Sequence, residues 1–270
     1  EENNTQSFLS CISDVFTVAF KKKKDGEEQE LKSNPELKIE ILKKYIIKNL
    51  TIDGFIILQN GELVNVFYNP KDDPDITDLK KSKFFKKISK VNVTDFYLKK
   101  VASAFNNFKA YILDDNEIID FTYLWDLICL PKKISPSSLF QDGLNLIILN
   151  SPDDDITSKI EIICPQNYYS KNVFDSNIRT MIIYCKNGYY EPIYKFTKTK
   201  KKTYKIQKLF NINNIITELP EIGNVLIGIW KDLSLRCKPL DSMPDKYNKQ
   251  LNVTENIHFK KLYDVLDSYK

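Results

Sequence analysis

Hydrophobic residues recur at helical spacing in four segments of the first half of the chain. In residues 7–20 the apolar side chains fall on one helical face, formed by Phe8, Leu9, Ile12, Val15, Phe16 and Ala19. Residues 34–50, 94–113 and 117–130 are also helical, with Asn34 and Pro35 as start signals for the first and Pro131 as a stop for the last. We therefore predict four helices, and a surface excursion over residues 69–92.

Continuous apolar runs and turn residues predict strands in the second half. Residues 144–149 and 159–165 are continuous apolar runs, as expected of strands buried on both faces. Residues 180–196 are a third run, divided into a hairpin at Asn187-Gly188, and residues 202–210 are one more strand. Asn60-Gly61, between two apolar runs, gives the strongest short-range hairpin signal in the chain.

The order of these elements predicts the fold class. Helices and a hairpin come first, and a cluster of strands and a mostly helical tail follow. This order is typical of an α+β fold with a central mixed β-sheet and helices packed around it. We expect residues 1–210 to form the core domain and residues 211–270 a C-terminal helical extension packed on it, with Trp230 and Tyr263 pointing inward.

Composition excludes several classes of protein. The chain is 42% hydrophobic and 28% charged, as is usual for a globular protein, and its net charge of +4 does not by itself imply nucleic acid. No apolar run approaches the roughly 20 residues that cross a bilayer, so we expect no membrane partner. Neither GxGxxG nor GxxxxGK[ST] occurs, which argues against Rossmann oxidoreductases and nucleotide-driven motors.

Because the chain does not begin with methionine, we expect it to be a domain of a longer protein.

The cysteine pattern predicts free thiols. The five cysteines are widely spaced and mostly in apolar context, and they are Cys11, Cys129, Cys164, Cys185 and Cys237. No CxxC pair occurs and the chain has a single histidine, so we expect no metal site and no cofactor. We interpret the cysteines as buried, reduced residues of an intracellular protein.

Two short motifs are candidates for a reaction centre. Gln6-Ser7-Phe8-Leu9 opens the first predicted helix, and residues 188–193, Gly-Tyr-Tyr-Glu-Pro-Ile, follow the late hairpin turn. Their order around the predicted strands resembles the OTU-type branch of the papain-like cysteine peptidases, over residues 3–20 and 120–196. In that family a cysteine opens a buried helix, whose N-terminus favours the thiolate, and a histidine on a late strand deprotonates it. The resemblance implies an OTU/papain-like arrangement of the sheet and helices.

The departures from this family pattern imply that the site is inactive. Ser7 stands where the family has cysteine, and Tyr189 stands where it has histidine. A serine needs a neighbouring base, and a tyrosine with a pKa near 10 is a poor one. The resemblance thus implies a catalytically inactive domain of a larger viral protein that acts as a protein-interaction or structural module. Its partner would be a ubiquitin-like protein or another viral protein. The lysine-, asparagine- and isoleucine-rich composition is similar to that of large DNA viruses of protists, so we expect a location in the host cytoplasm or the virion.

Two other functions stay open. An active cysteine protease or deubiquitinase would use Cys11, one helical turn after Ser7, as nucleophile and His258 as base, roughly 3 to 4 Å apart. A nucleic-acid-binding domain would use residues 195–205, where six of eleven residues are lysines and aromatic residues are interleaved. Its candidate binding residues are Lys198, Lys200, Lys201, Lys202 and Tyr204.

Overall fold

A computed structural model of the chain describes residues 4–20, 35–88, 95–152, 160–164, 174–199 and 203–237. Within these ranges the longer helices are α1 (Ser7–Phe20), α2 (Pro35–Asn49), α7 (Asp95–Leu113), α8 (Phe121–Cys129) and α10 (Gly223–Arg236). Shorter helices are α3 (Ile52–Phe55), α4 (Glu62–Phe67), α5 (Thr77–Lys81), α6 (Lys83–Ile88) and α9 (Ile215–Glu218). The four helices predicted for the first half are confirmed as α1, α2, α7 and α8, and the surface excursion contains the unforeseen α5 and α6.

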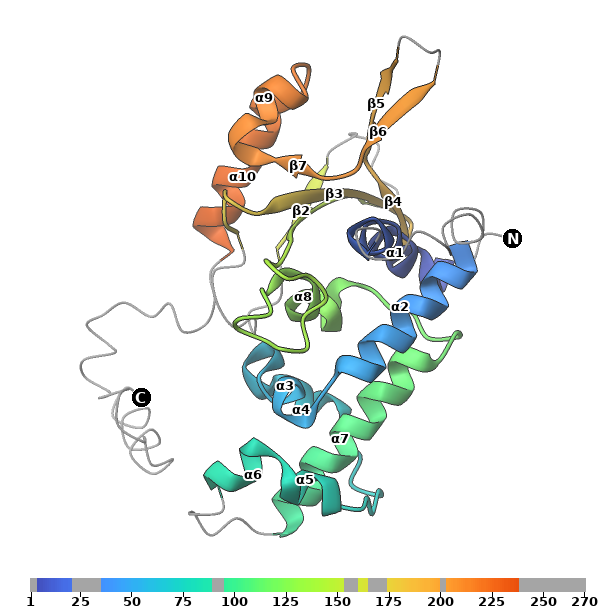
Figure 1. The fold of residues 1–270 in the computed structure, drawn as a ribbon, viewed down its shortest axis with the longest axis vertical. Helices are drawn as coiled ribbons and strands as arrows, with labels where there is room; N and C mark the ends of the chain where they lie inside the picture. Colours follow the sequence, from blue (N-terminus) through green and yellow to red (C-terminus); the bar gives the residue numbers. More distant parts are fainter. Residues whose placement is uncertain are drawn as a thin grey trace, which may run out of the picture.

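A mixed sheet lies at the centre of the fold, as predicted. Its strands are β1 (Asn145–Ser151), β2 (Glu161–Ile163), β3 (Arg179–Lys186), β4 (Tyr189–Pro192) and β7 (Phe210–Asn211). The order is β2-β1-β3-β4, with β1 and β3 parallel and β2 and β4 antiparallel to their neighbours. Strand β7 pairs with the first residues of β3, and β4 with its last ones. The α+β class with helices around a mixed sheet is confirmed (Figure 1).

The sheet separates two hydrophobic clusters. Leu146 and Ile148 of β1 belong to the larger cluster, which also contains the buried faces of α1, α2, α7 and α8. Between them in sequence, Ile147 belongs to the smaller cluster with residues of α9 and α10. Successive side chains of a strand point to opposite faces, so helices must cover both. Figure 1 shows α1 and α8 on one side of β3, and α9 and α10 on the other.

One buried polar side chain ties β1 to the segment before β3. The amide nitrogen of Asn145 donates to the carbonyls of Asp175 (2.7 Å) and Ile178 (3.3 Å) and to the Thr180 hydroxyl (3.3 Å). Its amide oxygen accepts from the Asp175 N–H at 3.0 Å. The Asn145 side chain is thus satisfied although the residue is fully buried.

The hairpin predicted at Asn60-Gly61 is wrong. Asn60 and Gly61 have positive φ angles of 54° and 88°, as a tight hairpin turn would require, but they join short helices rather than strands. Gln59 also has a positive φ, of 48°. The buried Asp126 carboxylate of α8 accepts a 2.6 Å hydrogen bond from the Gln59 N–H and holds the chain in this turn.

Smaller differences concern the strands and the tail. Strand β2 is an edge strand with half-buried and exposed residues, so the prediction that it is buried on both faces is wrong. The expected domain boundary between residues 210 and 211 falls inside β7, and this division stays a prediction. Trp230 is partly buried and packs edge-on against Phe174, whereas Tyr263 lies outside the described residues.

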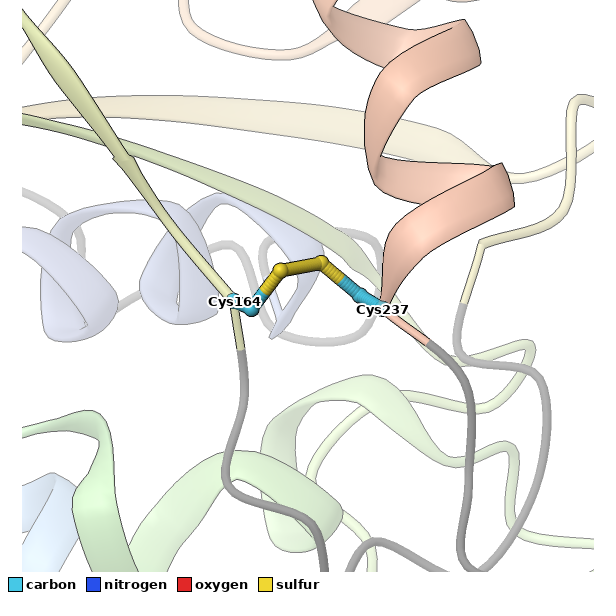
Figure 2. Close-up of a disulfide and its surroundings, with 2 residues drawn as sticks. All are labelled: Cys164 and Cys237. Atoms are coloured by element: carbon cyan, nitrogen blue, oxygen red, sulfur yellow. A yellow bond between two sulfur atoms is a disulfide. The ribbon is translucent and has the colours of Figure 1, made fainter.

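A disulfide joins two cysteines that we expected to be reduced. Cys164 follows β2 and Cys237 follows α10, and their Cα atoms lie 5.5 Å apart although 73 positions separate them in sequence (Figure 2). The pairing arises because α10 packs on the face of the sheet, which no cysteine spacing reveals. The thiols of Cys11, Cys129 and Cys185 are reduced and buried, as predicted.

Candidate functional site

Helix α1 and strand β4 bring the two sequence motifs together. Ser7 is the first residue of α1, as predicted. Asn187 and Gly188, with φ angles of 52° and 72°, form the predicted tight turn that returns β4 along β3. Strand β4 is the last strand in the sheet order, and α1 packs against its outer edge. Ser7 and Cys11, one helical turn apart, point toward this edge.

Backbone groups of Tyr190 are hydrogen-bonded to both candidate nucleophiles, Ser7 and Cys11. The Tyr190 N–H donates to the Ser7 hydroxyl at 3.2 Å, and its carbonyl accepts from the Cys11 thiol at 3.4 Å. Tyr190 lies opposite Cys185 of β3, where antiparallel geometry directs the backbone groups away from the partner strand. Leaving a buried backbone N–H or carbonyl without a hydrogen-bond partner costs free energy. Ser7 and Cys11 supply these partners for the N–H and the carbonyl of Tyr190, which β3 does not pair.

The Tyr190 side chain is packed into the core. Its ring lies edge-on to Phe8 of α1, with the ring centroids 5.3 Å apart. Burial raises the pKa of the Tyr190 phenol above its ordinary range, as do the nearby Asp120 and a hydrogen bond with Cys185. The phenol therefore stays protonated at neutral pH and cannot act as a base.

A pocket of about 460 Å³ lies between α1, α2 and β4. Ser7 and Tyr189, the pair that the family resemblance places across a reaction centre, both line it. The other lining residues are Ser10, Cys11 and Asp14 of α1, Lys38 of α2, and Tyr190, Glu191 and Pro192 of β4. The structure thus brings Ser7, Cys11 and Tyr189 to one site, while His258 lies outside the described residues.

The environment of Cys11 disfavours a reactive thiolate. Burial, reinforced by the negative charges of Asp14 and Glu191, raises the pKa of the Cys11 thiol to about 12. A nucleophilic cysteine needs the opposite, an exposed and electropositive surrounding that lowers its pKa. At neutral pH this thiol is therefore almost entirely protonated.

Asp14 is the centre of a charged cluster that our reading of the sequence missed. Its carboxylate accepts hydrogen bonds from Lys38 (3.0 Å) and Tyr194 (2.6 Å), and from Lys208. Although burial alone would raise the pKa of Asp14, hydrogen bonds from Lys208, Tyr194 and Lys38 lower it to about 2. The position of Asp14 on the same helical face as Ser7 and Cys11 is a signal that sequence could have offered.

The candidate nucleic-acid residues lie on another part of the molecule. Lys198 is in β5 (Lys195–Lys198) and Tyr204 in β6 (Tyr204–Gln207), and both are exposed. These strands form a separate two-stranded sheet, in which Lys198 and Tyr204 are directly opposite each other. Lys200, Lys201 and Lys202 lie outside the described residues.

The described residues include neither a candidate metal site nor a candidate membrane span. They contain no group of three or more histidine, cysteine or acidic side chains that could hold a metal ion. No helix within the same ranges combines the length and the apolar character that crossing a bilayer requires.

Comparison with known proteins adds no relative from which a function could be transferred. No family model, curated protein or solved structure matches this chain.

Proposed function

We propose that this chain is a catalytically inactive, OTU-like domain whose α1–β4 pocket binds a protein partner. One observation carries the proposal. The two side chains that could act as nucleophiles, Ser7 and Cys11, are hydrogen-bonded to the Tyr190 backbone and hold a strand in place. The OTU-like arrangement itself rests on the family resemblance, supported by the helix start and the late hairpin that meet at this pocket.

The pocket has the size and chemistry of a binding site for a peptide segment. Ligand pockets in proteins have volumes of about 300–1,000 Å³ and a few polar groups that fix the orientation of the ligand. Here Tyr189 and Pro192 offer apolar contact, and Ser10, Lys38 and Glu191 offer polar contact. We propose a ubiquitin-like protein or another viral protein as partner, in the host cytoplasm or the virion. Of these locations, the Cys164–Cys237 disulfide favours the virion, since disulfides are rare in reducing compartments.

Ubiquitin activity probes that react with thiolates test the absence of catalysis. We expect no covalent adduct with the wild-type chain, because the Cys11 thiol is buried and protonated. An adduct that disappears in Cys11→Ala would overturn this part of the proposal and favour the Cys11–His258 protease.

Titration of the isotopically labelled chain with ubiquitin tests the binding site. We expect amide chemical shifts to change at residues 7–14 and 189–192, and the affinity to fall at least about fivefold in Tyr189→Ala. Tyr97→Ala, which removes an exposed tyrosine ring from α7, serves as the control. Absence of shifts at about 1 mM ubiquitin, or shifts confined to other elements, would contradict a ubiquitin-like partner at this pocket.

A further inference from the structure

The β5–β6 hairpin projects from the rest of the fold and is attached at its base. Figure 1 shows it extending beyond α1 and the main sheet. At its base, Lys195 and Gln207 are opposite each other. The Gln207 amide donates to the Glu218 carboxylate of α9 at 2.8 Å, and the Lys195 ammonium donates to the Glu218 carbonyl. One face of the hairpin is thus directed toward α9.

The opposite face carries apolar side chains in solvent. Phe196 pairs with Ile206 and Lys198 pairs with Tyr204, and alternation along the strands places these four residues on one face. Phe196, Ile206 and Tyr204 are 60%, 47% and 63% exposed, so no described element covers them. We call Phe196, Lys198, Tyr204 and Ile206 the outer hairpin face.

The charge of the hairpin indicates which kind of partner fits this face. Residues 195–205 contain six lysines and no acidic residue. Such a segment attracts a polyanion, and each phosphate contact releases a counterion. The cations of this segment are all lysines, which bind phosphates as point charges and lack the rigid donor fork of arginine, so the attraction is directed mainly to the backbone.

The aromatic side chains add a second feature that matches single-stranded nucleic acid. Phe196 and Tyr204 are diagonal neighbours on the outer hairpin face, a relation that places side chains about 7–8 Å apart. Exposed rings on a sheet face stack successive bases when these are not paired in a duplex. Lys198 directly opposite Tyr204 places a cation beside one of these rings, within reach of a phosphate.

We propose that the outer hairpin face binds single-stranded nucleic acid with little sequence preference. The rings of Phe196 and Tyr204 stack on two bases, and Lys198 contacts the backbone between them. A duplex keeps its bases stacked inside and cannot make the ring contacts. This function is separate from the α1–β4 pocket and does not depend on it.

Fluorescence anisotropy with labelled 20-nucleotide oligo(dT) and oligo(U) tests this proposal at 50 mM and 200 mM salt. Removal of each ring, in Phe196→Ala and Tyr204→Ala, is expected to weaken binding by about tenfold. Lys198→Ala is expected to weaken it less and to reduce the slope of log affinity against log salt by about 0.7. Phe96→Ala, which removes a 65% exposed ring from α7, is the control and should bind as wild type does. Circular dichroism of each variant verifies that the fold is kept.

The outcomes separate this proposal from other partners. Tighter binding of one oligonucleotide would identify DNA or RNA as the ligand. Equal binding of duplex and single strand, or affinity that is unchanged when both rings are removed, would overturn the proposal. It would be overturned as well if no oligonucleotide bound at 50 mM salt, or if the chain bound only anionic phosphatidylserine vesicles. None of these results bears on the pocket, which is tested by Tyr189→Ala.

Discussion

At the scale of single residues, side chains that resemble catalytic groups have a structural role. Ser7 and Cys11 are the candidate nucleophiles of the first helix, yet each is hydrogen-bonded to the backbone of Tyr190. An edge strand presents unpaired N–H and C=O groups to other chains, and proteins protect such edges by covering them. Pro192 helps in the same way, because proline has no N–H to offer at this edge. Helix α1 thus closes the edge of β4.

Replacing Ser7 with alanine should destabilise the protein. The Tyr190 N–H would be left buried without its acceptor, at a cost of about 1–3 kcal/mol. Urea denaturation measures this as a lower midpoint with an unchanged slope. Ser10→Ala, on the same helix at the wall of the pocket, is the control and should unfold close to wild type. A Ser7→Ala protein as stable as the control would show that the Ser7 hydroxyl does not support the strand.

At the scale of elements, the same Asn-Gly dipeptide has two outcomes. At Asn187-Gly188 the flanking segments pair as β3 and β4, and the local signal sufficed to predict the turn. Asn60 and Gly61 also have left-handed conformations, but the preceding residue, Gln59, has one as well. The Asp126 carboxylate accepts a hydrogen bond from the Gln59 N–H and holds this longer turn in place. Asp126 is 67 positions away, so a local pattern could not reveal this contact. Turn residues were therefore predictable at both positions, but the elements that they connect were predictable only at Asn187-Gly188.

The Asp14 cluster shows the same limit for the candidate site. Helical spacing places Asp14 on the face of Ser7 and Cys11, which sequence alone reveals. Its partners Lys38, Tyr194 and Lys208 come from three other segments, and only the packed fold brings them to one carboxylate. The meeting of Ser7 and Tyr189 at one pocket, in contrast, was expected from a family resemblance, not from periodicity.

Asp14→Asn should remove an acid-sensitive part of the stability. The pKa of Asp14 in the folded protein is about 2, below its ordinary value of 3.8. A lowered pKa means that its stabilisation is complete above pH 4 and is lost as the pH falls toward 2. Because the cluster is partly exposed, we expect a contribution of about 1–2 kcal/mol. Denaturation at pH 2, 3, 4 and 7 should therefore show that the free energies of unfolding of wild type and Asp14→Asn differ at pH 7 and approach each other at the lowest pH.

Asp73→Asn is the matched control for this pH series. Asp73 also pairs with a lysine, Lys99, but its side chain is 82% exposed. Exposed ion pairs contribute little, so this variant should differ from wild type by less than about 0.5 kcal/mol. A constant gap between wild type and Asp14→Asn from pH 2 to 7 would contradict the role of the Asp14 charge.

At the scale of the whole molecule, the sheet divides the interior into two hydrophobic clusters. The disulfide links the helical layer on one face to the sheet. Helices α9 and α10 form a thin layer over the smaller cluster, and Cys237 at the end of α10 is tied to Cys164 after β2. The apolar runs predicted the strands that face both clusters. They could not predict the disulfide, since the pairing depends on where α10 crosses the sheet.

Reduction of this disulfide should lower the thermal midpoint of the whole molecule. Closing a loop of about 70 residues restricts the unfolded chain and stabilises a protein by about 2–4 kcal/mol. Thermal unfolding with and without a reductant measures the effect on wild type. The Cys164→Ser/Cys237→Ser variant should melt at the lower midpoint and show no response to the reductant. A wild-type midpoint that is insensitive to complete reduction would contradict the stabilising role.

The buried amide of Asn145 has a consequence for how the fold is specified. Apolar residues occupy both sides of β1 and β3 at their centres, so sliding one strand past the other by a residue would lose little buried surface. Asn145 can reach its partners around Asp175 and Thr180 in one alignment only. A leucine in its place would leave a chain that still collapses, yet distributes itself among several slipped structures. We therefore expect the uniqueness of this fold to depend on the Asn145 amide, which an apolar side chain could not replace.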